Sequence, residues 1–245
     1  FYAAIKAGAM PTTSQPGVGE FVELWEPIVA SGSDVLHVSL SSGLSGAFEA
    51  ASIAARQVMD AHPDRRVLVV DSLGASSGYG MLVEYLADKR DEGATLDEAY
   101  DWAMSHRLNV HHWFFSTDLT SYVRGGRVSR VSGFVGTALK ICPVLNMNSE
   151  GKLIPRDKIR TKAKAARDMV RRMEEHADGG HAYAGKCMLS MSACRSDAEY
   201  VRSLVEAAFP ALAGKVQIND VGTVIGSHTG PGTVALFFMG DERGE

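Results

Sequence analysis

The sequence predicts an α/β protein with two domains, an N-terminal doubly wound parallel-sheet domain and a C-terminal α/β domain with a mixed sheet. Two observations lead to this prediction. Through the first 110 residues, short buried apolar runs alternate with helical patterns, which is typical of a parallel sheet flanked by helices. Beyond residue 110 a hairpin signal appears at residues 148–151, and a hairpin joins antiparallel strands.

The length of the chain is consistent with two units. It has 245 residues, more than one typical domain, and 45% of them are hydrophobic, so a sizeable core can form. We expect domains over residues 1–110 and 111–245. The sequence starts at Phe1 without a methionine and in the middle of a helical pattern, and we therefore expect further residues upstream of Phe1 in the native chain.

Charge and targeting signals exclude several classes of function. The formal net charge of −4 gives no general attraction to nucleic acid or to an anionic membrane surface. No apolar run approaches the roughly 18 residues of a transmembrane helix, and no signal-peptide pattern opens the chain. Cys142, Cys187 and Cys194 lack metal-ligand spacing and an even count, which favours free thiols in a reducing cytoplasm.

The first elements are a helical turn, a polar loop and an amphipathic helix. Thr13 or Ser14 in the loop is expected to cap the helix, with Pro16 in its first turn. The helix has apolar residues at helical spacing, and Pro27 is expected to end or kink it.

The most informative stretch runs from Val35 to Ala61. It has the pattern of a buried strand, a turn of serines and glycines over residues 41–46 (the serine turn), and a helix. A helix start of this kind combines free backbone N–H groups with the positive end of the helix dipole, and so attracts anions. Capping alone needs one serine, whereas this turn has three, so we predict a ligand site with hydroxyls from Ser41, Ser42 and Ser45.

The rest of the first half repeats the pattern. Residues 66–72 are predicted to form a second buried strand, a helix follows from about Ser76, and Thr95–Glu98 is a capping box that starts another helix. Strand-to-helix turns of a parallel sheet open on one edge of the sheet. The loop at residues 12–16 and the serine turn are therefore expected to share a pocket.

The second half is predicted to begin with a strand at residues 112–117, a short helix from Leu119 closed by Gly125 and Gly126, and a helical stretch at 134–140. Hairpin strands at 142–148 and 152–158 and a basic helix from Arg160 to about His176 are expected next. The last predicted elements are a strand at 186–192, a capping box at Ser196–Glu199 with its helix, and strands at 215–221 and 234–239 separated by a loop over residues 223–232.

Several familiar chemical motifs do not fit. Gly43-Leu44-Ser45-Gly46 is not the G-x-S-x-G nucleophile elbow, although Ser45 with His228 as base and Asp71 or Asp220 as orienting acid stays open as an alternative. No P-loop and no G-x-G-x-x-G sequence follows the first strands. The histidines show no metal-ligand spacing on a helix face, so no metal site is expected.

Two further sets of residues are candidates for a binding role. His228 lies among Gly226, Gly230 and Gly232, where backbone can approach a ligand closely, although a lone loop histidine is more often a surface residue. Arginines recur around the start of the second half, and solvated surface charge explains them equally well: Arg124, Arg127, Arg130, Arg156 and Arg160.

Taken together, these stretches resemble the DegV family of bacterial fatty-acid-binding proteins. Two features depart from the family's pattern: its usual first strand with an aspartate-serine turn is missing, and Ala47 stands where threonine is frequent. The matching pieces occur in the family's order and span nearly the whole chain: Thr12–Pro16, Ser41–Gly46, Val70–Ser72, Leu119–Ser129 with Gly125-Gly126-Arg127, and His228–Gly232.

The resemblance implies two α/β domains (the EDD fold) and a lipid tunnel for a long-chain fatty acid such as palmitate or oleate, with no other cofactor. The carboxylate would be held by hydroxyls, which are here Thr13 or Ser14, and Ser45. The resemblance further implies a protein that is not itself an enzyme. It would present the acid to the catalytic subunit of a fatty acid kinase, which forms an acyl phosphate for phospholipid synthesis.

The resemblance also implies that a histidine and an arginine help such members to present the carboxylate. The histidine of H-T-G-P-G is here His228. For the arginine, which belongs to the second domain, Arg160 is the first choice and Arg127 the second. Two other functions stay open from the residues themselves. One is an acyl hydrolase or transferase that uses Ser45 and His228, and the other is a regulatory module that binds a small acid without a lipid tail.

Overall fold

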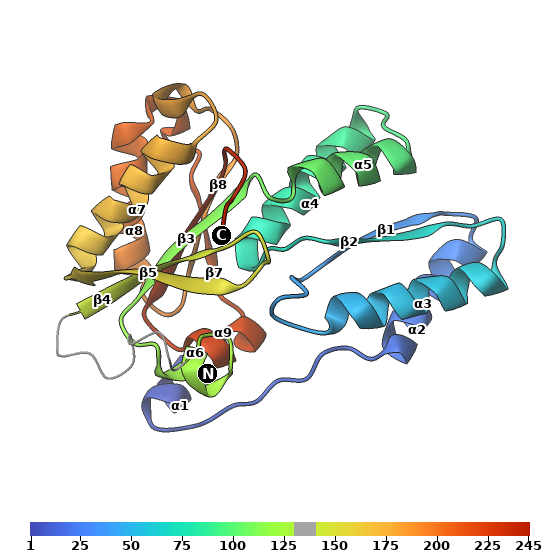
Figure 1. Cartoon of the computed structure of the whole chain (residues 1–245), viewed down its shortest axis with the longest axis horizontal. Helices are drawn as coiled ribbons and strands as arrows, with labels where there is room; N and C mark the ends of the chain where they lie inside the picture. Colours follow the sequence, from blue (N-terminus) through green and yellow to red (C-terminus); the bar gives the residue numbers. More distant parts are fainter. Residues whose placement is uncertain (130–140) are drawn as a thin grey trace.

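The computed structural model describes residues 1–129 and 141–245 and contains two β-sheets (Figure 1). The smaller sheet is parallel and pairs β1 (Val35–Ser39) with β2 (Val67–Asp71). The larger sheet has the strand order β5-β4-β3-β8-β6-β7, in which β6 and β7 pair in parallel and the other neighbours pair antiparallel. The predicted α/β class and mixed second sheet are confirmed.

The six strands of the larger sheet come from the second half of the chain. The predicted hairpin is present, and residues 148–151 join its two strands. The helical stretch predicted at residues 134–140 and the candidate Arg130 lie outside the described residues. The strands are β3 (Val110–Ser116), β4 (Ile141–Met147), β5 (Leu153–Arg160), β6 (Cys187–Met191), β7 (Gln217–Asp220) and β8 (Thr233–Met239).

Helices cover both faces of the small sheet, as the doubly wound pattern predicts. Helices α2 (Val18–Ala30) and α3 (Ala47–Ala61) pack on one face, while α4 (Ser76–Asp91) and α5 (Leu96–His106) lie on the other (Figure 1). The α2/α3 side has its own apolar core, in which the buried side chains of these amphipathic helices, Ala47 apart, cluster together with Val67 of β2.

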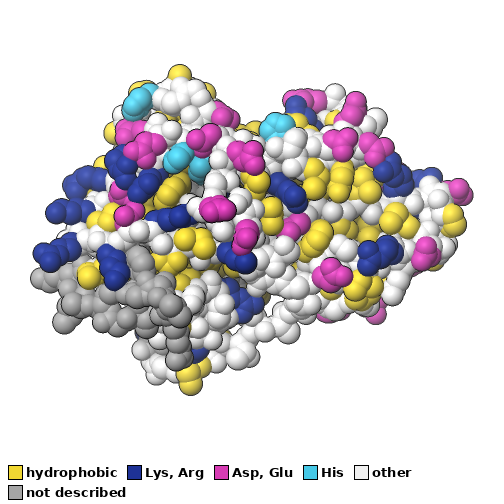
Figure 2. All heavy atoms as spheres, viewed as in Figure 1, with side chains coloured by type: hydrophobic (Ala, Val, Ile, Leu, Met, Phe, Trp, Pro, Cys, Tyr) yellow, Lys and Arg dark blue, Asp and Glu magenta, His cyan; other side chains and the backbone are white. Residues whose placement is uncertain are grey.

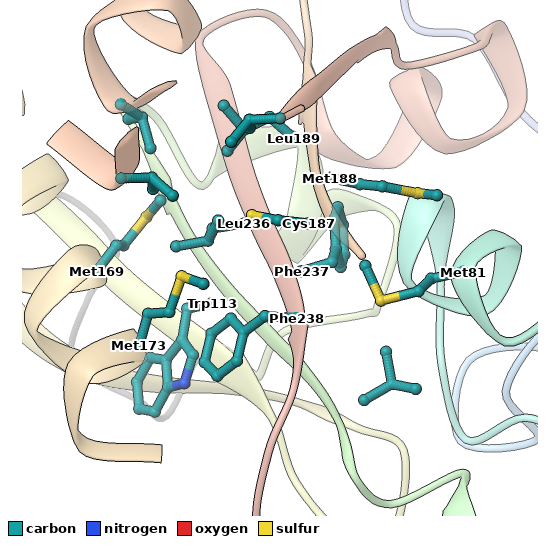
Figure 3. Close-up of a cluster of buried hydrophobic side chains, with 14 of the residues drawn as sticks. Met81, Trp113, Met169, Met173, Cys187, Met188, Leu189, Leu236, Phe237 and Phe238 are labelled. Carbon is teal, nitrogen blue, oxygen red and sulfur yellow. The ribbon is translucent and has the colours of Figure 1, made fainter. Parts of the chain in front are cut away.

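Two layers of helices also enclose the larger sheet. Helices α7 (Lys162–His176) and α8 (Arg195–Ala208) cover one face, and α4 packs against the other through β3, β6 and β8. Figure 3 shows Met169 and Met173 of α7 beside Trp113, and Met81 of α4 near Phe237. Strands β3, β6 and β8 are therefore buried on both faces, which explains their largely apolar sequences.

Short helices complete the fold at one end of the larger sheet: α1 (Tyr2–Lys6), α6 (Thr120–Arg124) and α9 (Thr223–Thr229) (Figure 1). Two 3₁₀ turns, η2 (Gly180–Ala182) and η3 (Pro210–Leu212), pack against α7 and α8. The Tyr2 hydroxyl donates to the Val221 carbonyl at 2.7 Å, so the first residues pack on the second half of the chain. Residues 7–17 then run back to α2 and are called the strap below. The domain boundary near residue 110 stays a prediction.

Local expectations at two helix starts and in one loop were wrong. Helix α2 begins at Val18, and its N-cap Gly17 donates its N–H to the Glu20 carboxylate at 2.7 Å, so neither Thr13 nor Ser14 caps it. Helix α8 begins at Arg195 without a side-chain cap, so Ser196 is already inside the helix. The stretch expected as a loop at residues 223–232 contains α9.

Pro27 also departs from expectation, because α2 runs through it to Ala30. Trp25 and Val29 on either side of the proline are 1% and 2% exposed, and burying them offsets the one backbone hydrogen bond that proline removes. The capping box at Thr95–Glu98 is confirmed, since the Thr95 hydroxyl accepts from the Glu98 N–H and the Glu98 carboxylate accepts from the Thr95 N–H. Within the described ranges, none of the helices combines the length and apolar character needed to cross a membrane.

Candidate functional site

A cavity of about 740 Å³ lies where the carboxyl end of β1 and the start of α4 meet β3, β8 and α9. Its size falls within the range of small-molecule sites, and its wall is mostly apolar. Polar side chains gather where the strap, the serine turn and α9 approach one another. The apolar wall includes Leu44, Phe114, Met147, Leu153, Ala235 and Phe237.

The structure brings five of the six predicted site residues to this cavity. Thr13, Ser14, Ser45, Arg127 and His228 all line it, although they come from four separate stretches of the chain.

Arg160, the sixth, lies at the far end of edge strand β5 and outside the cavity wall. It is exposed, as are Arg156 and Lys158 on the same strand, and the three share one face because side chains alternate along a strand. Figure 2 shows Lys and Arg side chains gathered over this side of the molecule.

The serine turn is fixed by contacts to a distant part of the chain. The Ser41 hydroxyl donates to the Gly151 carbonyl at 2.8 Å and accepts the Gly43 N–H at 3.1 Å. The Ser45 N–H donates to the Ser41 carbonyl at 3.2 Å, which closes the turn. The Ser45 hydroxyl oxygen accepts the Ala47 N–H at 3.2 Å, so its hydrogen is available to a ligand oxygen.

The start of α3 leaves backbone donors available beside Ser45. Helix α3 begins at Ala47, and its N-cap Gly46 has no side chain to satisfy the first N–H groups. A side chain at Gly46 would meet the Gln15 side chain of the strap, with 2.5 Å between an added Cβ and Gln15 Oε1. The Gln15 side chain of the strap therefore lies directly against the start of α3.

Thr13 and His228 are hydrogen-bonded across the cavity mouth. The distance between Thr13 Oγ1 and His228 Nε2 is 2.7 Å. His228 Nδ1 is buried and has no partner within the described residues. It lies against Gly125, where an added Cβ would come within 2.3 Å of Nδ1. The absence of a side chain at Gly125, the residue after α6, therefore leaves room for the His228 ring.

The electrostatic setting keeps His228 neutral at pH 7. Burial lowers the pKa of His228, and the nearby positive charges of Arg127 and then Arg124 lower it further. Arg127 donates its Nε and Nη2 hydrogens to the Leu44 carbonyl at 3.2 and 3.0 Å, which holds its guanidinium beside the serine turn. An incoming anion would find hydroxyls, helix N–H groups and one guanidinium together.

A serine-hydrolase arrangement is not assembled here. The described residues offer no acceptor or acid for His228 Nδ1, and His228 Nε2 is engaged by Thr13. Asp71, one of the two acids considered from the sequence, instead accepts the N–H groups of Ser42 and Leu73 at 3.1 Å each. The geometry therefore supports binding of an acid better than nucleophilic attack by Ser45.

One cluster in the described chain could ligate a metal, and it lies away from this cavity. His111 Nε2 is 3.0 Å from Asp241 Oδ1, and His176 Nδ1 is 3.1 Å from the same oxygen. Sequence spacing could not find this cluster, because its members come from β3, α7 and the residues after β8. Arg156, Arg172 and Arg243 line the same small recess and oppose a cation there.

Comparison with known proteins gives consistent matches along the chain. The sequence profile described as "Uncharacterised protein, DegV family" matches residues 1–241. A DegV domain-containing protein of Clostridium perfringens is 32% identical over 243 residues, which cover 99% of this chain and 82% of that protein.

Two solved structures are similar in fold and sequence. A DegV lipid binding protein from Thermotoga maritima has a TM-score of 0.83 and 28% identity, covering 99% of this chain and 82% of that one. A DegV family protein from Thermus thermophilus, described for its fatty acid binding, has a TM-score of 0.84 and 27% identity, covering 98% and 83%.

Proposed function

The chain belongs to the DegV family, and from that membership we propose that it binds a long-chain fatty acid, with the tail in the 740 Å³ cavity and the carboxylate at the serine turn. The observation that carries the proposal is the convergence of Thr13, Ser45 and His228 at one end of a mostly apolar cavity. The similar proteins from Thermotoga maritima and Thermus thermophilus, described as lipid binding and fatty acid binding, support it.

The tail and the headgroup of the fatty acid contribute differently to the free energy of binding. A tail of ~16 carbons at ~0.8 kcal/mol per buried CH₂ gives an upper bound near ~12 kcal/mol. An unpaired buried carboxylate would cancel much of this, so its oxygens need donors. Ser45, the free N–H groups of α3 and Thr13 supply them. The tail then sets the affinity, and the headgroup donors select for acids.

Native mass spectrometry tests the proposal directly. The purified protein should carry a fatty acid, or take up palmitate or oleate when delipidated. A protein that stays at its apo mass after incubation with both acids would contradict the proposed function.

Ser45→Ala should weaken binding of palmitate by roughly 10-fold or more, because a hydrogen bond to a charged group contributes about 1.5–3 kcal/mol. Ser52→Ala is the matched control. Ser52 lies in α3, the helix that follows the serine turn, but outside the cavity wall, and its hydroxyl donates to the Phe48 carbonyl. Isothermal titration of both variants checks the difference. Equal affinities for the two variants would remove Ser45 from the headgroup site.

Binding should tighten as the pH falls from about 8 towards the lowered pKa of free His228. A bound carboxylate raises the pKa of a neighbouring histidine, so the complex takes up a proton and is favoured at lower pH. The titration of His228, followed by NMR in the free and the palmitate-bound protein, should show the higher pKa in the complex. An identical pKa in both states would place the carboxylate away from His228.

We further propose that the protein presents the bound acid to the catalytic subunit of a fatty acid kinase in the cytoplasm and is not itself an enzyme. The carboxylate site lies at the partly exposed mouth formed by the strap and Arg127, where a partner could reach it. Arg127 replaces Arg160 as our first choice for the presenting arginine, because Arg127 lines the cavity. The exposed Arg160 on β5 is left as a candidate for contact with the partner.

A regulatory module for a small acid is the remaining alternative. A small acid would bind the same headgroup donors, but without a tail it would leave most of the apolar cavity unfilled. Comparing the affinities of octanoate and palmitate separates the two, because the fatty-acid proposal predicts a gain with chain length and the small-acid alternative predicts none.

A further inference from the structure

The cavity contains polar atoms that a simple hydrocarbon tail would leave without partners. His37 Nε2 and Ser39 Oγ are buried and have no hydrogen-bond partner within the described residues. Both residues line the cavity, and Ser39 is only 2% exposed. Buried polar groups are nearly always hydrogen-bonded, so each exception indicates a partner such as a ligand or an ordered water.

The two residues lie on the same face of β1, since they are two positions apart in one strand. The His37 ring packs against Phe21 and Trp25, with 5.3 Å between ring centroids in each case. Burial lowers the pKa of His37, so its ring is neutral and offers one donor and one acceptor. Aromatic neighbours leave little to hold a lone water, which needs two to four polar partners.

Two other polar side chains of the wall, His112 and Ser190, already have hydrogen-bond partners. His112 has Nδ1 on the Val110 carbonyl at 2.8 Å and Nε2 on the Ala75 N–H at 3.1 Å. The Ser190 hydroxyl is bonded to those of Ser76 and Ser77 at 2.9 and 2.7 Å. His37 and Ser39 therefore differ from these in having hydrogen-bonding capacity to spare.

We propose that the cavity accepts a fatty acid with a hydroxyl group partway along its chain, and that His37 and Ser39 bind this hydroxyl. The inference rests on the proposed fatty-acid function and specifies the substrate class. A hydroxyl can both donate and accept, so it can satisfy either atom whichever nitrogen of His37 carries the proton. Both residues lie on β1, before the serine turn that is proposed to hold the carboxylate, so the hydroxyl that they bind belongs to the tail.

The test compares stearate with 10-hydroxystearate and 12-hydroxystearate by competition for one fluorescent fatty acid. In the unmodified protein, at least one of the two mid-chain hydroxy acids should bind about fivefold more tightly than stearate, as expected for one net hydrogen bond. 2-Hydroxystearate, whose hydroxyl lies next to the carboxylate, should show no such gain.

Two variants remove the proposed partners with little change of shape. His37→Phe keeps an aromatic ring between Phe21 and Trp25, and Ser39→Ala removes only the hydroxyl oxygen. In the double variant the ratio should reverse, so that stearate binds more tightly, because a buried hydroxyl is then left unpaired. Ser52→Ala, outside the cavity wall, should keep the unmodified ratio.

The outcomes separate the two proposals. Tight binding of stearate with no preference for either mid-chain hydroxy acid would overturn the inference and leave the fatty-acid function standing. The inference is also overturned, with the fatty-acid function left standing, if the double variant and Ser39→Ala alone still bind a mid-chain hydroxy acid more tightly than stearate. Failure of every acid to bind would overturn both.

Discussion

Ala235→Trp should lower the affinity for palmitate by about 100-fold or more. Ala235 is half-buried in the middle of β8, opposite Phe114 of β3 and Ser190 of β6, and it lines the cavity. An indole at this position occupies space needed by the tail. Excluding about four CH₂ groups at ~0.8 kcal/mol each costs ~3 kcal/mol, which corresponds to roughly two orders of magnitude in Kd.

Titration with palmitate and octanoate checks this expectation. The shorter acid needs less of the cavity and should lose much less affinity than palmitate. Ala211→Trp is the matched control, since Ala211 is exposed and outside the cavity wall, and it should bind both acids as the unmodified protein does. If Ala235→Trp binds palmitate normally and is folded, the tail does not pass this part of β8.

Gly43→Ala should destabilise the protein by about 1–3 kcal/mol and also weaken palmitate binding more than 10-fold. A Cβ at residue 43 would lie 2.6 Å from the Glu150 carbonyl oxygen and 2.7 Å from that of Gly151. These are backbone atoms, so the serine turn must move away from the β4–β5 turn. The hydrogen bond from Ser41 to Gly151 is then lost, and Ser45 shifts with the turn.

Gly80→Ala is the matched control for this substitution. Gly80 lies inside α4, and an added Cβ there would meet no atom within 4 Å. Alanine is favoured over glycine in a helix by about 1 kcal/mol, so this variant should be more stable than the unmodified protein. Chemical denaturation gives both free energies of unfolding. A Gly43→Ala protein with unmodified stability and affinity would show that the two turns do not touch.

Local chemistry explains which predictions from the sequence succeeded. Alternating strands and helices, the hairpin at residues 148–151 and the capping box at Thr95 depend on periodicity and on contacts within a few residues, and all were confirmed. Pro27 failed as a helix end because the burial of Trp25 and Val29, which is a tertiary effect, outweighs a local preference.

The candidate site divides in the same way. A shared pocket of the hydroxyl-rich turn and the strap was predicted from residue types and order, whereas the role of His228 at the carboxylate was implied by the resemblance to the family. The structure places all three at one cavity. The choice between arginines could not be made from the sequence. Arg127 and Arg160 occur in equally basic surroundings, and only the packing of the 125–129 stretch against Leu44 brings one of them to the cavity.

By itself, the sequence determined the α/β class and the mixed second sheet, because each leaves a local pattern, and it supplied the candidate residues for holding an acid. The tertiary structure decided where those residues meet. Thr13 and His228 are hydrogen-bonded although 215 positions separate them, and the serine turn is held by a turn 110 positions away. Such contacts depend on how the sheets and helices pack, so no local pattern encodes them. The unpaired atoms of His37 and Ser39 became visible for the same reason, since burial and missing partners exist only in the folded chain.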